Sequence, residues 1–219
     1  MSEQPFVMLL NDSATYTLHV VPHADALAHL AAEATLFWAS KAIQRRGVFH
    51  WALSGGTTPR TLYQLLAQPA FAARLDWSRV HVWWSDERAV PPDHPESNFR
   101  LAHEALLSHV PIPTEQMHRV RTELGAVEAA QAYEQTMRTT MGLASEVGLP
   151  RFDLILLGMG EDGHTASLFP YTPALEARDR WVVANPVPKL GAMRITFTFP
   201  LINAADAVIF LVSGARKAT

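Results

Sequence analysis

The stretch Phe152-Asp153-Leu154-Ile155-Leu156-Leu157 is almost wholly apolar and runs directly into Gly158-Met159-Gly160. Side chains of a strand point alternately to its two faces, so a nearly continuous apolar run predicts a strand that is covered on both faces. Such strands are typical of parallel sheets that have helices on either side. The stretch therefore predicts an α/β protein.

Neighbouring segments extend this pattern along the chain. Short apolar runs predict further strands, and longer segments with apolar residues at helical spacing predict helices between them. Alternating strands and helices indicate right-handed βαβ units, so we expect one domain over residues 1–219, a Rossmann-like, open, largely parallel sheet with helices on both faces. The expected strands cover residues 16–21, 48–53, 80–84, 152–157, 181–184, 195–199 and 207–212, and the expected helices cover residues 24–46, 98–109 and 126–143, with another around 62–66.

Two of these segments carry more detailed expectations. Strand 195–199 alternates Ile195, Phe197 and Phe199 with two threonines, which predicts that Thr196 and Thr198 lie on an exposed face. Helix 24–46 should end at Gly47. The apolar positions at helical spacing in that helix are Leu27, Leu30, Ala31, Ala34, Phe37 and Trp38.

Composition excludes several classes of protein. The 219 residues carry 18 Lys and Arg against 21 Asp and Glu, and this balance offers no broad basic surface for a nucleic-acid backbone. The absence of cysteine excludes disulfides, thiolate metal sites and a cysteine nucleophile. The N-terminus lacks a signal-peptide pattern, and no stretch approaches the ~18 consecutive apolar residues of a membrane span. We expect a cytoplasmic protein without nucleic-acid or membrane partners.

The first candidate ligand loop is Ser54-Gly55-Gly56-Thr57-Thr58-Pro59, which follows strand 48–53 and opens a helix. In an open α/β sheet, ligands bind beyond the carboxyl ends of the strands. The two glycines let backbone N–H groups approach a ligand, and a helix start favours an anion. An ordinary strand-to-helix turn, capped by Thr57 or Thr58, explains the loop equally well.

Cations on separate elements predict a phosphate site. Arg88 belongs to Ser85-Asp86-Glu87-Arg88, directly after strand 80–84, and can grip phosphate oxygens in a bidentate fork. The alternative for this loop is an internal ion pair between Arg88 and Asp86 or Glu87. Arg194 and Lys217 are further candidates from later elements, and for them the alternative is an ordinary solvated charge.

The third candidate loop, Gly158 to Thr165, contains the strongest chemical signal. Its glycines fit the dinucleotide pattern G-x-G-x-x-G, but the loop lies late in the chain and the next strand ends without an acid to hold a ribose. His164, on a glycine turn at the ligand edge, fits a general base, since an imidazole normally titrates near pH ~6.5. Asp162 either orients that ring or caps the turn. No metal-binding motif is present.

Together these segments resemble the 6-phosphogluconolactonases of the glucosamine-6-phosphate isomerase/deaminase-like superfamily. The most specific match is Gly158-Met159-Gly160-Glu161-Asp162-Gly163-His164-Thr165-Ala166-Ser167-Leu168-Phe169-Pro170. The loops at 54–59 and 85–88 with Ser97-Asn98, the stretch Arg194-Ile195-Thr196 and the segment 213–217 also match.

The resemblance implies hydrolysis of 6-phospho-D-glucono-1,5-lactone, a phosphosugar lactone, to 6-phosphogluconate without a metal or organic cofactor. It implies that His164, with Asp162, activates water. It further implies that Arg88, Arg194 and Lys217 hold the phosphate, while Thr57, Gly55 and Gly56 line the site. Family members usually continue beyond the position of Thr219, so we expect the 1–219 domain to lack C-terminal elements usual in the family.

Two other functions remain open on sequence grounds. A glucosamine-6-phosphate deaminase or isomerase would share the first two loops, but His164 is followed by Thr165-Ala166-Ser167 without the acid that those enzymes use for ring opening. The second loop likewise reads Asp-Glu-Arg rather than Asp-Glu-Tyr. A non-catalytic sugar-phosphate-binding protein is the third possibility. The sequence does not indicate an oligomeric state.

Overall fold

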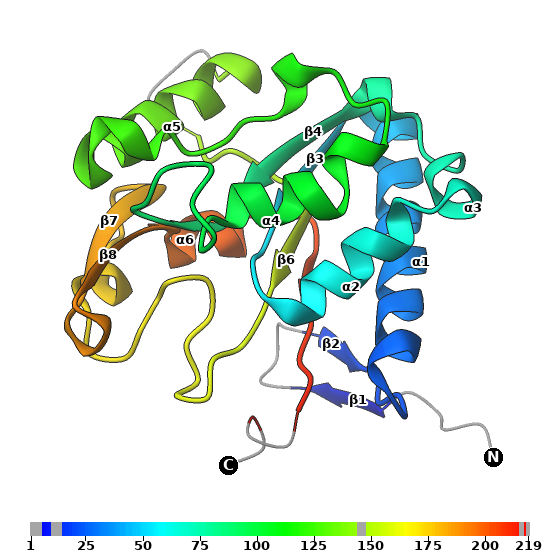
Figure 1. Ribbon diagram of the computed structural model, residues 1–219, viewed down its shortest axis with the longest axis horizontal. Coiled ribbons are helices and arrows are strands. Elements are labelled where there is room, and N and C mark those ends of the chain that lie inside the picture. The colour runs from blue at the N-terminus through cyan, green and yellow to red at the C-terminus, as the bar shows by residue number, and fades with distance from the viewer. Residues whose placement is uncertain (1–5, 10–14, 144–147, 215–216, 218–219) are drawn as a thin grey trace.

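A computed structural model describes residues 6–9, 15–143, 148–214 and 217 of the chain. Two sheets form its framework (Figure 1). The parallel sheet has the order β4-β3-β6-β9, and the antiparallel sheet has the order β5-β8-β7. The strands are β3 (Phe49–Leu53), β4 (Val80–Trp84), β5 (Asp86–Arg88), β6 (Leu154–Leu157), β7 (Val182–Val187), β8 (Ala192–Phe197) and β9 (Val208–Phe210), with β1 (Phe6–Leu9) and β2 (Thr15–Leu18) as a separate antiparallel pair.

Helices connect these strands and cover the parallel sheet (Figure 1). The α-helices are α1 (Ala24–Arg46), α2 (Thr57–Leu66), α3 (Pro69–Ala72), α4 (Asn98–Ala105), α5 (Ala126–Thr140) and α6 (Phe199–Asn203). Short 3₁₀ helices comprise η1 (Trp77–Arg79), η2 (Leu107–His109), η3 (Thr114–Gln116), η4 (Thr122–Leu124), η5 (Pro173–Glu176) and η6 (Pro188–Leu190). None of the helices in the described residues is both long and apolar enough to cross a membrane.

The parallel sheet is buried on both faces, as the apolar run at 152–157 predicts. Alternate residues of its strands enter two separate hydrophobic clusters, because successive side chains point to opposite faces. Trp51, Leu154 and Leu156 pack with α1, α2 and α4, whereas Ala52 and Ile155 pack with α5 and the antiparallel sheet. The α/β class with helices on both faces of a parallel sheet is confirmed.

The strands expected at 181–184 and 195–199 differ from the simple parallel picture. They form β7 and β8, which pair antiparallel with each other, and β8 also pairs with β5. The expectation of exposed threonines on this strand is wrong, because Thr196 and Thr198 are fully buried. Their hydroxyls form hydrogen bonds to distant parts of the chain: Thr196 accepts a hydrogen bond from the Ser167 N–H, and Thr198 donates to the Arg180 carbonyl. The residues 85–88, expected as a loop, include β5.

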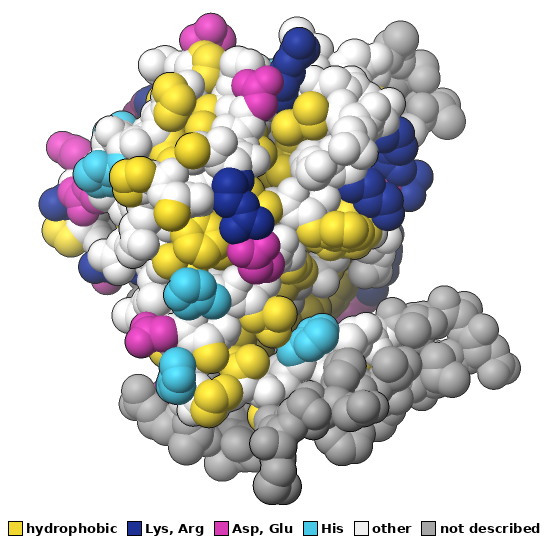
Figure 2. Space-filling view, turned by 90° about the vertical axis from the view of Figure 1, so that its right-hand side faces the viewer, with side chains coloured by type: hydrophobic (Ala, Val, Ile, Leu, Met, Phe, Trp, Pro, Cys, Tyr) yellow, Lys and Arg dark blue, Asp and Glu magenta, His cyan; other side chains and the backbone are white. Residues whose placement is uncertain are grey.

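Helix α1 has the expected boundaries, and Gly47 ends it in a left-handed conformation with φ 76°. The apolar stripe is rotated from the expected one, however, and Phe37 is 61% exposed. The buried face consists instead of Ala28, Ala31, Ala32, Thr35, Leu36, Ala39 and Ala42. Small side chains allow the helix to approach its neighbours closely. The large side chains on the opposite side of α1, such as Phe37, are left at the surface. The side of the molecule that carries α1 and α3 shows hydrophobic side chains scattered among charged groups and histidines (Figure 2).

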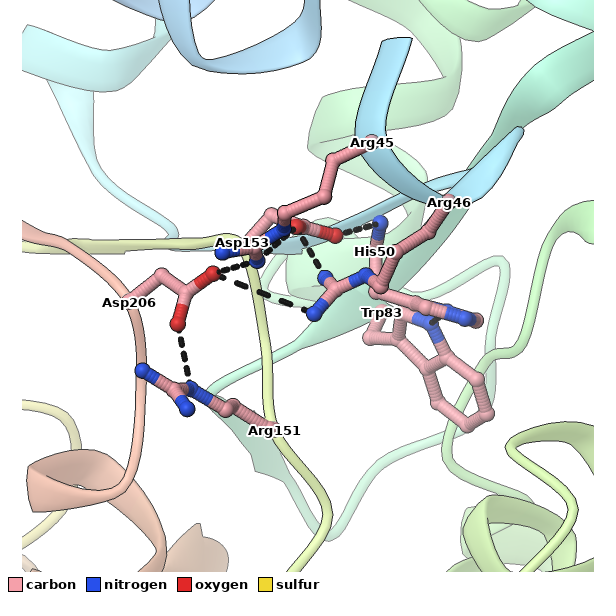
Figure 3. Close-up of polar contacts among 7 residues, drawn as sticks. All are labelled: Arg45, Arg46, His50, Trp83, Arg151, Asp153 and Asp206. Carbon is pink, nitrogen blue, oxygen red and sulfur yellow. Dashed lines mark hydrogen bonds and ion pairs between the residues drawn. The ribbon is translucent and has the colours of Figure 1, made fainter. Parts of the chain in front are cut away.

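An ionic cluster closes the amino ends of the parallel strands (Figure 3). Asp153, immediately before β6, is 1% exposed and pairs with Arg46, while its second oxygen accepts the His50 N–H at 2.9 Å. Asp206, which precedes β9, pairs with Arg45 and Arg151. The cluster ties the last turn of α1 to the start of the sheet, at the edge opposite the carboxyl ends of the strands.

Candidate active site

A cavity of about 420 Å³ lies beyond the carboxyl ends of the parallel strands. Its wall comes from the segments that follow β3, β4, β6 and β9, together with the β7–β8 hairpin. Strand β3 pairs with β4 on one side and β6 on the other, so the connections diverge to either side of it, which creates a crevice. The three loops singled out in the sequence therefore meet at one edge, as expected.

Seven of the eight site residues expected from the sequence line this cavity: Gly55, Gly56, Arg88, Asp162, His164, Arg194 and Lys217. Thr57 does not line it. Thr57 is the first residue of α2 and is exposed to solvent, and the cap of this helix is Gly56 rather than a threonine. Gly56 adopts φ 106°, a conformation that disfavours side chains, and the chain turns there into the helix.

His164 and Asp162 form the central pair of the site. The Nδ1 atom of His164 lies 2.5 Å from Oδ1 of Asp162, and the imidazole stacks on Phe169 with ring centroids 3.8 Å apart. Both polar side chains are about a quarter exposed, at 25% and 23%. The carboxylate takes up Nδ1, so Nε2 is the nitrogen left to receive a proton from water. Stacking and hydrogen bond together fix the ring plane.

The turn beneath this pair depends on glycine. The Gly160 N–H donates to the His164 carbonyl at 2.7 Å, and Gly163 adopts φ 79°. A Cβ atom on Gly160 would lie 2.0 Å from Nδ1 of His164, well inside contact distance. Gly160 thus makes room for the His164 ring. In a dinucleotide-binding G-x-G-x-x-G loop, by contrast, glycines let the backbone approach the pyrophosphate.

The electrostatics of Asp162 reflect two partners. Burial raises its pKa, but hydrogen bonds from His164 and from Lys189 outweigh burial and hold the pKa of this carboxyl well below its usual range. The Lys189 ammonium lies 2.9 Å from Oδ2, the oxygen that His164 does not contact. Asp162 is therefore a carboxylate under all conditions near neutral pH.

Arg88 and Arg194 form the cationic end of the cavity. They are direct cross-strand partners on β5 and β8, and within the part of the chain that the structure describes neither forms an ion pair. Burial and the nearby Arg88 guanidinium lower the pKa of Arg194. Two neighbouring guanidinium groups without a bound carboxylate are arranged to receive an anion.

Lys217 completes the group of cations that the sequence predicts. Its Nζ donates to the carbonyl of Met159 at 2.6 Å, which brings the end of the chain onto the loop that carries His164. The lysine reaches the cavity from the segment after β9. All three expected phosphate ligands consequently face one cavity.

The alternative of an ion pair between Glu87 and Arg88 is wrong. Glu87 is 2% exposed, and its carboxylate accepts the N–H groups of Asn98 and Phe99, each at 2.8 Å. Glu87 therefore binds the start of α4, where its negative charge interacts favourably with the positive end of the helix dipole. Burial raises the pKa of Glu87, and these backbone donors oppose the shift. Ser97 is the N-cap of the helix, and its hydroxyl accepts the Arg100 N–H.

The lining residues that the sequence did not predict include Lys189, Asp86 and Asn98. Lys189 lies in η6 at the tip of the β7–β8 hairpin, and Asn98 lies against Gly55 and contacts Asp86. The Asn98 amide donates to the Asp86 carbonyl at 2.9 Å, and Oδ1 of Asn98 is buried without a hydrogen-bond partner among the described residues. Alternation along β5 was the available signal, because Asp86 and Arg88 share one face of that strand while Glu87 faces α4.

No set of three His, Asp or Glu side chains in the described residues is arranged to hold a metal ion.

Comparison with known proteins gives a consistent result. The family model described as glucosamine-6-phosphate isomerases/6-phosphogluconolactonase matches residues 22–219. A 6-phosphogluconolactonase from a Nostoc species is 47% identical over 203 residues, which cover 92% of this chain and 81% of the relative. One from a Synechocystis species is 50% identical over 180 residues, covering 81% of this chain and 72% of the relative.

Solved structures agree with the sequence relatives. The structure titled 6-phosphogluconolactonase from Trypanosoma cruzi superposes with a TM-score of 0.81 at 31% identity, covering 90% of this chain and 80% of that one. The enzyme of that title from Thermotoga maritima gives a TM-score of 0.75 at 34% identity, covering 88% and 83%.

Proposed function

The chain belongs to the glucosamine-6-phosphate isomerase/6-phosphogluconolactonase family, and from this membership we propose the lactonase reaction for its site. The protein hydrolyses 6-phospho-D-glucono-1,5-lactone to 6-phospho-D-gluconate, the second step of the oxidative pentose phosphate pathway. The observation that carries the proposal is that one cavity holds both the His164 imidazole, whose Nδ1 is bonded to Asp162, and the guanidinium groups of Arg88 and Arg194, which form no ion pair among the described residues. The first serves water activation and the second binds a phosphate.

Binding begins at the phosphate. A phosphate monoester is close to a dianion at pH 7, and Arg88 and Arg194 offer two planar forks to its oxygens. Lys217, whose Nζ donates to the Met159 carbonyl, adds a third positive charge to the lining of the cavity. Anchoring the phosphate fixes the position of the lactone ring relative to His164, which converts the attack of water into an oriented step.

His164 then acts as the general base. Its Nε2 removes a proton from a water molecule, and the water oxygen forms a bond to C1 of the lactone. The carbonyl electrons move onto the carbonyl oxygen, and when they return, the bond from C1 to the ring oxygen breaks. The imidazolium gives its proton to the departing ring oxygen. Asp162 keeps Nδ1 as the donor throughout, so the reactive tautomer is maintained. General-base catalysis of this kind contributes typically 10²–10⁴-fold.

The negative charge on the carbonyl oxygen requires donors. Gly55 and Gly56 line the cavity at the start of α2, where free backbone N–H groups and the positive end of the helix dipole face an anion. We assign the backbone N–H groups of these two residues the role of stabilising the negative charge on the carbonyl oxygen.

The test compares two substrates. Wild-type protein is assayed on freshly generated 6-phosphogluconolactone and on unphosphorylated gluconolactone, with dehydrogenation of the product as the coupled signal. We expect a much higher kcat/KM for the phosphorylated lactone. Equal values on both would remove the cationic anchor from the mechanism.

A second assay separates the lactonase from the deaminase. Release of ammonia from glucosamine 6-phosphate would assign the chain to the other activity of its family. The His164→Asn variant should lose at least two orders of magnitude in kcat on the lactone, and His19→Asn, a change at an exposed histidine, serves as the matched control. Unchanged turnover in His164→Asn would exclude His164 as the base.

A further inference from the structure

Lys189 occupies an unusual place beside the His164–Asp162 pair. It lies at the tip of the β7–β8 hairpin, 27 residues along the chain from Asp162, and its side chain is 69% exposed. Nevertheless its Nζ reaches Oδ2 of Asp162 at 2.9 Å, while Oδ1 binds Nδ1 of His164 at 2.5 Å. Each oxygen of the Asp162 carboxylate thus has its own hydrogen-bond donor, the imidazole on Oδ1 and the ammonium group on Oδ2.

A carboxylate beside an imidazole has two opposing effects on a base. It orients the ring, but it also stabilises the imidazolium, and a ring that is already protonated cannot accept a proton from water. An ammonium group on the far oxygen reduces the second effect, since its charge offsets that of the carboxylate. It preserves the first, because it holds Oδ2 and thereby prevents the carboxylate from rotating away from Nδ1.

We propose that Lys189 is a positioning residue of the hydrolytic reaction: its ammonium group fixes Asp162 against Nδ1 of His164 and offsets the charge of the carboxylate beside the imidazole. This inference rests on the proposed function, since it presupposes that His164 is the base. Lys189 acts through Asp162 and is not a ligand of the substrate phosphate.

Lys189 differs from the other charged residues of the cavity in its ion pair with Asp162. The other charged side chains that line the cavity are Asp86, Arg88, Glu161, Arg194 and Lys217. Among the described residues, only His164 and Lys189 form ion pairs with Asp162. Lys217 is directed to the Met159 carbonyl, and Arg194 is a cross-strand partner of Arg88.

The variant that tests the inference is Lys189→Met, which keeps the length of the side chain and removes its charge. One unit charge at this range through partly aqueous surroundings should move the acid limb of the kcat–pH profile upward by about 0.5–1 pH unit. We therefore expect kcat to fall several-fold near pH 6 and to approach the wild-type value near pH 8, with KM almost unchanged. Lys189→Arg, which retains the charge, should restore most of the wild-type profile. Uncatalysed hydrolysis of the lactone is subtracted at each pH.

Two other kinetic results would overturn the inference. A raised KM with an unchanged pH profile would make Lys189 a ligand of the substrate. An equal loss of kcat at every pH would leave Lys189 only the hold on Asp162 and would refute the effect of its charge on His164. Lys41→Met is the matched control, because Lys41 lies over Trp38 on α1, away from the cavity, and its loss should leave the profile in place.

An NMR titration without substrate completes the test. The ring signals of His164 are assigned by their absence in His164→Asn, and their titration midpoint is then compared between wild type, Lys189→Met and Lys41→Met. We expect an upward shift in Lys189→Met alone, and an identical midpoint in all three would refute the coupling. This measurement is independent of turnover. If His164→Asn retained full activity, the proposed base would fail while the charge coupling remained measurable.

Discussion

The Cα atom of Gly160 lies so close to the imidazole of His164 that an added Cβ would come within 2.0 Å of Nδ1. The same Cβ would lie 2.8 Å from Oδ1 of Asp162. A single hydrogen atom in place of a methyl group therefore permits the contact between the two side chains of the central pair.

Gly160→Ala should displace His164 from Asp162 and lower kcat by at least 10²-fold, because a misplaced base loses most of its contribution. The backbone at Gly160 is not in the left-handed region, so we expect the melting temperature to change little. Gly158→Ala is the control, since a Cβ at Gly158 meets nothing within 4 Å. Comparable activity of the two variants would show that the imidazole is not confined as the structure describes.

Arg194→Met should act on substrate binding. Loss of a charge-assisted hydrogen bond of about 1.5–3 kcal/mol corresponds to roughly a 10- to 150-fold increase in KM for the phosphorylated lactone. Hydrolysis of unphosphorylated gluconolactone should be unaffected, because that substrate has no anion to bind. Arg178→Met, at an exposed arginine outside the cavity, provides the comparison. An equal effect on both substrates would place Arg194 in the chemistry instead.

Asp153→Ala should affect stability without affecting turnover. Asp153 is 1% exposed and accepts hydrogen bonds from Arg46, whose side chain is 31% exposed, and from the buried His50 N–H, and loss of a buried hydrogen-bond partner costs about 1–3 kcal/mol. The free energy of unfolding, measured in urea, should fall by about that amount. Glu33→Ala breaks the exposed pair with Arg74 and should leave the free energy of unfolding almost unchanged. Similar losses in the two variants would contradict the burial of Asp153.

Acid should destabilise the fold through two histidines, the buried His50 and the half-buried His118. Burial lowers the pKa of His50 to about 3 and that of His118 to about 4, and the neighbouring His81 contributes to both shifts. In the unfolded chain both rings titrate near the ordinary histidine pKa. Below that pH the unfolded state therefore binds more protons than the folded state. Stability from these groups is therefore fully present above pH ~6.5 and is lost as the pH falls toward about 4.

The measurement is the urea midpoint as a function of pH. Between pH 6.5 and 4.5 we expect a loss on the order of 3 kcal/mol. His118→Gln should flatten this dependence, because one of the two titrating rings is removed, although it also deletes the contact of 2.9 Å between His118 and His81. A dependence of equal steepness in the variant would mean that His118 is protonated in the folded protein.

Much of this organisation could be predicted from the sequence. The strands 80–84 and 154–157, and the full length of α1, follow from apolar patterns that are local in the chain. The loop containing Asp162 and His164 was identifiable because glycine, carboxylate and imidazole follow a buried strand directly. The cations Arg88, Arg194 and Lys217 were also identified as candidates, and their convergence depended on the strand order.

Other features depend on tertiary contacts that the sequence does not display. Thr196 alternates with apolar residues as a surface residue would, yet its hydroxyl accepts a hydrogen bond from Ser167 inside the protein. The ion pair of Lys189 with Asp162 joins two segments through a hairpin whose antiparallel pairing was not anticipated. Phe37 was misplaced because the alanine face of α1 packs more closely than a face with large side chains would.

The ionic cluster and the cavity lie at opposite ends of the same strands. Substitutions at sites that share no partners usually have additive effects. Substitutions around Asp153 and Asp206 that raise the free energy of unfolding should therefore let the chain tolerate more random mutations, without a loss of kcat. A library built on such a reinforced parent could explore new substrates at the carboxyl edge, where most changes that alter recognition also cost stability.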